Sequence, residues 1–252
     1  MKLRILISTF TLLIAASVSA TAQTERIEGA TRQALEEMPL EGRSAESFTP
    51  KFWKIETQAV GDLNMDGSAD KVLSFEIDAE NAEGEKILKD PSGVFNLLPS
   101  PSIVAVLFAT NDGKFHRVAV NSRLKPNLEF YEEFAMEIKT GVLLVNEDYS
   151  SSSDANRVVF RYRYDLATDK LMLIGFDFEY YMRDKSGNSV TRSENYLTGE
   201  RVVTVKESER RKNGEFYYAG TRTTREKFKP VIIAFEKTFL NREGGYVDVR
   251  PF

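Results

Sequence analysis

The chain has 252 residues, of which 42% are hydrophobic and 29% are charged, and its formal net charge is −4. This is the composition of a globular protein with enough chain to build a sizeable core. Because the sequence contains no cysteine, it excludes disulfides, thiolate metal sites, iron–sulfur clusters and cysteine nucleophiles, and its acidic balance argues against nucleic acid as a partner.

The first 22 residues have the form of a secretory signal peptide. Lys2 and Arg4 supply a positive start, residues 5–18 an apolar stretch, and Ala20-Thr21-Ala22 a cleavage site of the A-x-A type. The apolar stretch is shorter than the ~20 residues that a membrane span needs, and no cysteine follows it to carry a lipid. We therefore expect a protein without a membrane span that is periplasmic or extracellular after cleavage.

Beyond the signal peptide, the sequence divides into residues 23–50, an N-terminal helix and connector, and residues 51–252, a single antiparallel β domain. Apolar residues at helical spacing predict one short amphipathic helix over residues 24–38, which Pro39 ends. Residues 39–50 are polar and are expected to connect this helix to the β domain.

A candidate metal loop lies between the first two predicted strands, residues 52–60 and 71–79, in which apolar and polar residues alternate. Residues 61–70 read Gly-Asp-Leu-Asn-Met-Asp-Gly-Ser-Ala-Asp, and Gly67 allows a sharp turn because it has no Cβ. Calcium takes six to eight oxygen ligands, so this spacing of oxygens suits it. The oxygen donors are the side chains of Asp62, Asn64, Asp66 and Asp70 and the carbonyl of Ser68.

The loop is not an EF-hand, because the twelfth position counted from Asp62 is Leu73 and not glutamate. The alternative is a turn without metal, since Asp, Asn and Gly favour turns on their own. Asn111-Asp112-Gly113 is a turn of that kind in this chain. The sequence therefore predicts a calcium site that clasps a hairpin at its tip, with a plain turn as the other interpretation.

The middle of the chain reads as strands joined by turns. Residues 80–101 are predicted to form a long surface loop with one helical turn near residues 95–98, and residues 102–110 a buried central strand, because they are continuously apolar. A tight turn then leads into a strand over residues 114–121. Further strands are predicted at Ala135–Lys139, Val142–Asn146, Arg157–Asp165, Lys170–Tyr181, Ser189–Tyr196, Arg201–Lys206, Glu215–Ala219 and Val231–Phe235.

Short strands at this spacing indicate a mainly β, antiparallel fold. The metal-loop pattern occurs only once, whereas a full propeller needs several blades. We therefore expect either partial propeller-like, blade-like sheets or a bent β-sandwich, with one short N-terminal helix.

The metal loop and the segments that follow it resemble a group of uncharacterised secreted bacterial proteins that carry a single FG-GAP (integrin-α-like) calcium loop. The similarity covers about residues 50–205, and only the loop itself is a specific motif. The resemblance implies a β fold and a calcium ion on Asp62, Asn64, Asp66, Ser68 and Asp70, and it implies no activity. The other matching segments are Ile103–Phe108, Asp112–Ala119, Phe160–Tyr164, Leu173–Asp177 and Asn195–Gly199.

Groups suited to catalysis are sparse. His116 is the only histidine, and no Gly-x-Ser-x-Gly element accompanies it, so a Ser-His-Asp triad is not predicted. Asp177 and Glu179 alternate with aromatic residues and so share one face of a strand, about 7 Å apart. That separation falls in the range of inverting glycosidases, but a solvated strand face gives the same spacing.

Three other stretches receive structural interpretations. Residues 147–154, rich in serine, are predicted to be a flexible loop, and the aromatic residues of 176–181 and 216–218 are assigned to the core and to cross-strand pairs. Residues 24–99 carry 16 acidic and 8 basic side chains, whereas residues 200–229 carry 5 acidic and 9 basic ones. We interpret the basic stretch as solvated strand faces.

Taken together, these features predict an exported calcium-binding β domain that acts as a non-enzymatic binding or interaction protein with a protein or glycan ligand. Two alternatives remain open. One is a carboxylate-based hydrolase of envelope glycans centred on Asp177 and Glu179, and the other is a periplasmic inhibitor or immunity protein.

Overall fold

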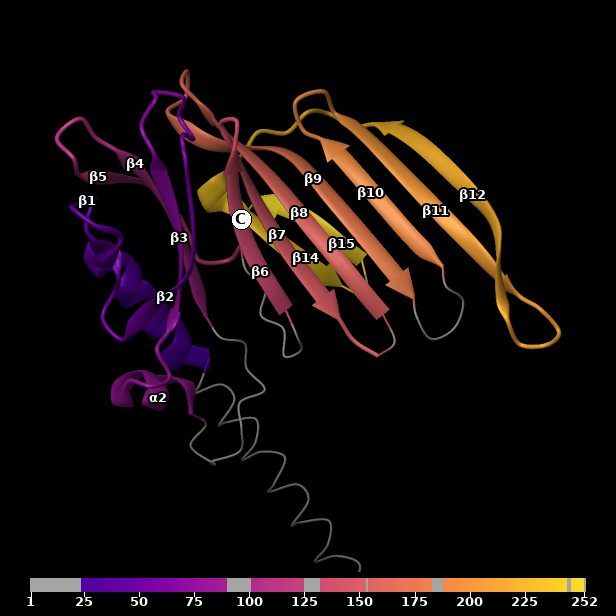
Figure 1. Ribbon diagram of the computed structural model, residues 1–252, viewed down its shortest axis with the longest axis horizontal. Helices are drawn as coiled ribbons and strands as arrows, with labels where there is room; N and C mark the ends of the chain where they lie inside the picture. The colour runs from indigo at the N-terminus through magenta and orange to yellow at the C-terminus, as the bar shows by residue number, and fades with distance from the viewer. Residues whose placement is uncertain are drawn as a thin grey trace, which may run out of the picture.

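The computed structural model describes residues 24–89, 101–124, 132–152, 154–182, 188–243 and 246–251. The chain is mainly β, with a five-stranded and an eight-stranded antiparallel sheet that do not close into a barrel (Figure 1). This confirms the predicted fold class, and the bent β-sandwich is the alternative that fits. The predicted signal peptide and the helical turn near residues 95–98 lie outside the described residues.

The five-stranded sheet has the order β1-β5-β4-β3-β2. It contains the predicted metal-loop hairpin (β2–β3) and the predicted central strand (β4), which lies between β3 and β5 and is buried along almost its whole length. A sheet covered on both faces favours such continuous apolar runs. Its strands are β1 (Glu41–Gly42), β2 (Trp53–Gly61), β3 (Asp70–Ile77), β4 (Ser102–Ala109) and β5 (Phe115–Asn121).

The eight-stranded sheet has the order β12-β11-β10-β9-β8-β7-β6, and the short strand β13 pairs with β9 off this path. Each neighbour in the path follows in sequence, so the sheet is a meander of hairpins. Its strands are β6 (Glu132–Lys139), β7 (Val142–Ser150), β8 (Asp154–Asp165), β9 (Lys170–Met182), β10 (Ser189–Asn195), β11 (Glu200–Arg210), β12 (Phe216–Lys227) and β13 (Ile233–Ala234).

Two helices, two 3-10 turns and a hairpin complete the described chain. The predicted N-terminal helix is present over residues 24–37 and is followed by a 3-10 turn, η1 (Ala45–Phe48). A second 3-10 turn, η2 (Phe235–Lys237), precedes the C-terminal hairpin of β14 (Thr238–Glu243) and β15 (Tyr246–Pro251). No helix in the described part of the chain is both long and apolar enough to cross a membrane.

The prediction of a loop throughout residues 80–101 is wrong for its first part, which forms helix α2 (Ala82–Leu88). Asn81 caps this helix, because its side-chain oxygen accepts hydrogen bonds from the backbone N–H groups of Glu83 and Gly84. An ion pair between Lys86 and Glu83 stabilises the exposed face of the helix further.

Most of the strands from β7 to β12 extend further than predicted. The supposed flexible loop over residues 147–154 is mostly strand, with β7 reaching Ser150 and β8 starting at Asp154. Their polar residues are compatible with strands because one face of this sheet is open to solvent. The strand expected over residues 231–235 is reduced to β13 and the start of η2.

Two apolar clusters lie on opposite faces of the five-stranded sheet. One face packs under the N-terminal helix, with Ala34 and Met38 of that region against Leu73 and Phe75 of β3. The other face packs against the inner face of the eight-stranded sheet, where Val106 of β4 shares the core with residues such as Phe160. The molecule is therefore layered as helix, five-stranded sheet and eight-stranded sheet, with the C-terminal hairpin behind the larger sheet (Figure 1).

The two sheets meet where β2 runs beside β6. Gly61 at the end of β2 approaches β6 so closely that an added Cβ would lie 2.8 Å from the Cβ of Ile138. The loop that follows Gly61 is therefore positioned at the junction of the two sheets.

Candidate functional site

The predicted metal loop connects β2 and β3 at this junction and contacts both sheets. Leu63 points into the core between the sheets and is 1% exposed, whereas its neighbour Met65 is 71% exposed. Met65 lies over the turn between β6 and β7, since a Cβ added at Gly141 would lie 2.9 Å from its Cγ. The loop thus anchors through one buried leucine and covers the turn of the neighbouring sheet.

Side-chain oxygens of the loop accept hydrogen bonds from its own backbone. The two carboxylate oxygens of Asp62 accept from the N–H groups of Asp66 at 3.0 Å and Gly67 at 2.9 Å. The side-chain oxygen of Asn64 accepts from the same Asp66 N–H at 3.0 Å. One amide therefore holds an oxygen of Asp62 and an oxygen of Asn64 close together, and the tight turn is completed by the positive φ angles of Met65 and Gly67.

Asp66 is exposed on the outer side of the loop. Its carboxylate accepts hydrogen bonds from the backbone N–H of Ser68 at 2.8 Å and from the side-chain amide of Asn64 at 2.9 Å. These donors, led by the Ser68 N–H, lower the pKa of Asp66 because they stabilise the charged form. Asp66 is therefore held as a carboxylate within reach of solvent.

Asp70 differs from the other predicted ligands because it is completely buried. One of its oxygens accepts from the N–H groups of Leu63 at 2.8 Å and Asn64 at 3.2 Å, and the other accepts from the N–H of Ala109 at 2.9 Å. Burial raises the pKa of Asp70, and these three hydrogen bonds oppose that rise. Asp70 thus ties the loop to the end of β4.

In chemistry, the residues of the loop fit a calcium ion: three carboxylates, an amide and a hydroxyl-bearing residue within nine positions. In arrangement, the fit is partial. Oxygens of Asp62 and Asn64 meet at the Asp66 amide, and the Asp66 carboxylate is linked to the Asn64 side chain, whereas Asp70 faces the backbone of the loop and of β4. Within the described residues, no group of three or more His, Cys, Asp or Glu side chains converges closely enough to hold a metal ion.

The second predicted pair, Asp177 and Glu179, lies on the outer face of β9. Both line a shallow groove of about 420 Å³ over β7 to β10, together with Arg157 and Arg161 of β8 and the hydroxyl of Thr191. Asp177 forms an ion pair with Arg161. The outer face of the larger sheet is turned toward the viewer in Figure 1, with no described element over it.

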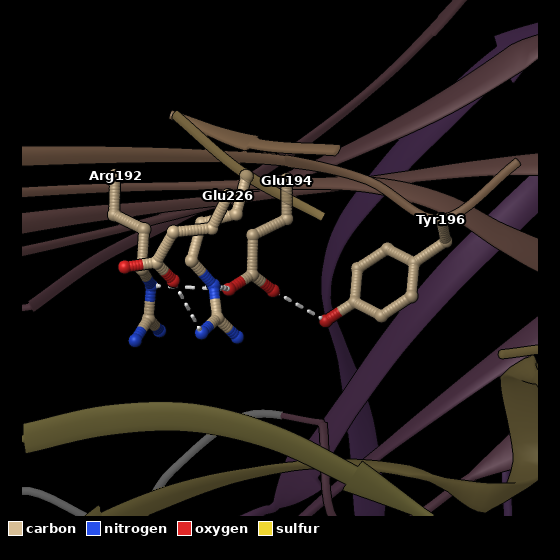
Figure 2. A network of polar contacts seen from close by, with 5 residues as sticks. Arg192, Glu194, Tyr196 and Glu226 are labelled. Carbon is tan, nitrogen blue, oxygen red and sulfur yellow. Dashed lines mark hydrogen bonds and ion pairs between the residues drawn. The ribbon is translucent and has the colours of Figure 1, made fainter. Parts of the chain in front are cut away.

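The inner face carries a buried ion network that the sequence did not reveal (Figure 2). Glu194 of β10 is 3% exposed and accepts a hydrogen bond from Arg201 of β11 at 2.6 Å and one from the Tyr196 hydroxyl at 2.8 Å. Arg192 lies 3.5 Å from Glu194, and Glu226 of β12 lies 3.7 Å from Arg201. The only sequence signal is that Arg192 and Glu194 alternate along one strand; their partners become visible only once the strand register is known.

The single histidine and the aromatic residues singled out in the sequence lie at positions that packing and strand pairing explain. His116 is exposed on β5, as expected for a strand histidine. Phe176 and Phe178 are buried in the core between the sheets, and Phe176 packs against its cross-strand partner Phe160 of β8 with ring centroids 5.5 Å apart, which confirms their assignment to core and cross-strand packing. Tyr217 is exposed and donates a hydrogen bond to Glu209 across the β11–β12 pair.

Comparison with known proteins gives no match to a family model, to a curated protein or to a solved structure.

Proposed function

We propose that this protein is an exported, non-enzymatic binding protein in which a calcium ion on the loop at residues 62–70 fastens two β-sheets together. The observation that carries the proposal is the position of the loop, which reaches the core between the sheets through Leu63 and lies over the turn at Gly141. An ion that stiffens this loop acts on both sheets at once. The signal-peptide form of residues 1–22 supports export.

The outer oxygens of the loop are the donors we assign to the ion. An oxygen of Asp62 and the oxygen of Asn64 accept hydrogen bonds from the Asp66 amide, and the Asn64 side chain donates to the Asp66 carboxylate. Asp62 and Asp66 together contribute two negative charges. Ser68 follows immediately and completes the donor set through its carbonyl. When bound, calcium supplies positive charge that offsets the repulsion between these carboxylates.

Asp70 has a different role in this proposal. Because its carboxylate already accepts three backbone N–H groups, it fixes the shape of the loop with or without an ion. Substitution of Asp66 should therefore remove an ion ligand, whereas substitution of Asp70 should disrupt the shape of the loop itself.

The outer groove supports a binding role rather than catalysis. Asp177 is engaged by Arg161, whereas both carboxyl groups of a glycosidase must be free to act as acid and as base or nucleophile. Its mixture of guanidinium, carboxylate and hydroxyl groups suits a polar protein surface or a glycan. If the ligand is a protein, this chain could act as an inhibitor or immunity protein that binds its target enzyme through the groove.

Thermal unfolding with and without calcium tests the proposal. Millimolar calcium should raise the Tm of the purified protein by several degrees relative to excess chelator, since an ion that binds only the folded state stabilises it by about 2.7 kcal/mol at one hundred times its Kd. Magnesium at the same concentration should have a smaller effect, because it demands shorter, near-octahedral coordination.

Two variants make this experiment decisive. Asp66→Ala should abolish the calcium response while changing the Tm in chelator little, since Asp66 is exposed. Asp112→Ala removes an exposed carboxylate from the β4–β5 turn and should leave the calcium response intact. A calcium response that survives in Asp66→Ala, or its absence from the unmodified protein, contradicts the proposal.

A further inference from the structure

The free edge of the eight-stranded sheet is β12, which pairs only with β11 among the described residues. A bulge between β11 and β12 interrupts the pairing near Gly220, and from Thr221 to Lys227 the pairing is regular. All seven side chains of Thr221–Lys227 are exposed. No described element runs beside this edge in Figure 1. A regular exposed edge strand is a ready template for another strand.

The sequence of this edge, Thr-Arg-Thr-Thr-Arg-Glu-Lys, combines two properties. Threonine favours strands, so the segment is well suited to pairing along its length. Its charges, however, set conditions on the partner strand, because like charges directly opposite each other destabilise a pair of strands.

A second copy of the same edge can pair with it in only a few ways. In an antiparallel pair, residues that face each other both direct their N–H and C=O groups toward the partner or both direct them away. In a pair related by a two-fold axis, the axis therefore passes between one residue and its own copy. Each possible central residue defines a different set of facing side chains.

With Thr224 at the centre, Arg222 of each copy faces Glu226 of the other, so two attractive pairs form. Arg225 then faces Thr223, and Lys227 faces Thr221. No like charges lie opposite each other in this register.

The neighbouring registers are worse. Centres at Arg222, Arg225, Glu226 or Lys227 place a charged residue directly opposite its own copy, and a centre at Glu226 also places Arg225 opposite Lys227. Centres at Thr221 or Thr223 give no attractive charge pair within Thr221–Lys227. The edge is therefore electrostatically self-complementary at Thr224 alone.

We propose that two copies of this protein associate through β12 in the register centred on Thr224, which continues the eight-stranded sheet across a two-fold axis. Arg222 and Glu226 lie on the same side of the sheet, as does Arg201, which pairs with Glu226 at 3.7 Å within one copy. In the dimer, Glu226 therefore lies between a guanidinium of its own chain and one of the partner copy. The outer face with its groove stays open on both copies.

Sedimentation velocity on the purified protein, from about 1 to about 500 µM, tests the proposal. We expect a concentration-dependent dimer. Arg222→Glu replaces two attractive pairs by two repulsive ones and should weaken dimerisation about tenfold or more, and Glu226→Arg should weaken it as well.

The charge-exchanged double variant Arg222→Glu/Glu226→Arg should restore part of the lost association, because the two pairs between the copies re-form with their charges reversed, while Arg201 loses its Glu226 partner within each copy. Arg225→Glu is the matched control: it makes the same charge change on the same strand, but its residue faces Thr223, so dimerisation should change less than threefold. Circular dichroism of each variant checks that the monomer stays folded.

A monomer at all concentrations overturns the proposal. So does a dimer that Arg222→Glu leaves unchanged, or a double variant that stays as weak as the single ones. Equal weakening by Arg225→Glu and Arg222→Glu would show that net charge, rather than this register, governs the association, and would overturn it too.

Discussion

At the scale of single residues, Asp70 shows how a side chain of ligand type can serve the fold. Its two oxygens accept three backbone N–H groups, two from the loop and one from the end of β4. A buried N–H without an acceptor is costly, so this carboxylate satisfies donors that are buried or partly buried. Three bonds to one side chain also fix the direction in which the chain enters β3.

Replacement of Asp70 by asparagine tests this account. Asparagine offers one oxygen and one NH2 group, so at least one of the three N–H donors would face another donor. Asp70→Asn should lower the free energy of unfolding by about 2 kcal/mol, measured by urea denaturation in the presence of chelator. Asp78→Asn is the control, since Asp78 accepts a single hydrogen bond, from the N–H of Glu80 in an exposed turn, and should change stability by less than about 1 kcal/mol. Equal effects would contradict the special role of Asp70.

At the scale of elements, the metal loop is an inter-sheet contact as well as a turn. Leu63 enters the core that contains Val72 of β3 and Leu143 of β7, and Gly61 and Gly141 allow the close approach of β2 and of the loop to the second sheet. A hairpin turn on a free edge would have no reason to bury a leucine.

Leu63→Ala should therefore behave as a core substitution although it lies in a turn. We expect a loss of about 2–5 kcal/mol in the free energy of unfolding, from lost burial and the cavity that remains. Met65→Ala, two residues away and exposed, should cost less than about 1 kcal/mol. Chemical denaturation of both variants measures the difference, and a Leu63→Ala protein as stable as Met65→Ala would show that the loop is not part of the core.

At the scale of the whole molecule, the two sheets share one continuous core, with η2 packed against β5 of one sheet and β9 of the other. Phe235 of η2 is fully buried and contacts Tyr162 of β8 edge-to-face, with ring centroids 5.1 Å apart. The buried side chain of Asn121 on β5 donates hydrogen bonds to the backbone oxygens of Phe235 and Thr238. Each sheet therefore depends on the other to bury its core face.

Unfolding should consequently be a single transition. The only tryptophan, Trp53, lies in the cluster under the N-terminal helix, so its fluorescence reports on the five-stranded sheet. Far-ultraviolet circular dichroism is dominated by the larger sheet. The two signals should give the same urea midpoint, and separate midpoints would show that the sheets unfold independently.

The parts of the fold that could be predicted are those whose sequence pattern lies within a single segment. The β2–β3 hairpin and β4 were predictable because side-chain alternation and a continuous apolar run are encoded within each segment. Helix α2 was missed because it has only seven residues and depends on the Asn81 cap and on close packing at Gly84, where an added Cβ would lie 2.1 Å from the Asp78 oxygen.

In the candidate site, Asp62, Asn64 and Asp66 lie close together because hydrogen bonds within the loop link them, and such local proximity can be read from sequence spacing. The role of Asp70 was not predictable, because it depends on Ala109, which is distant in the chain. The network around Glu194 was hidden for the same reason: Arg201 and Glu226 become its neighbours only through the pairing of β10, β11 and β12.

The bond between Asp70 and the N–H of Ala109 spans 39 positions of the sequence. Closing a segment of that length costs entropy that grows only slowly with length, but the cost must be met before the bond forms. A chain in which only the β2–β3 hairpin has formed would lack this anchor, so the loop reaches its native shape only once β4 is also in place. A ligand that binds the native loop therefore binds only molecules in which β4 has already paired with β3.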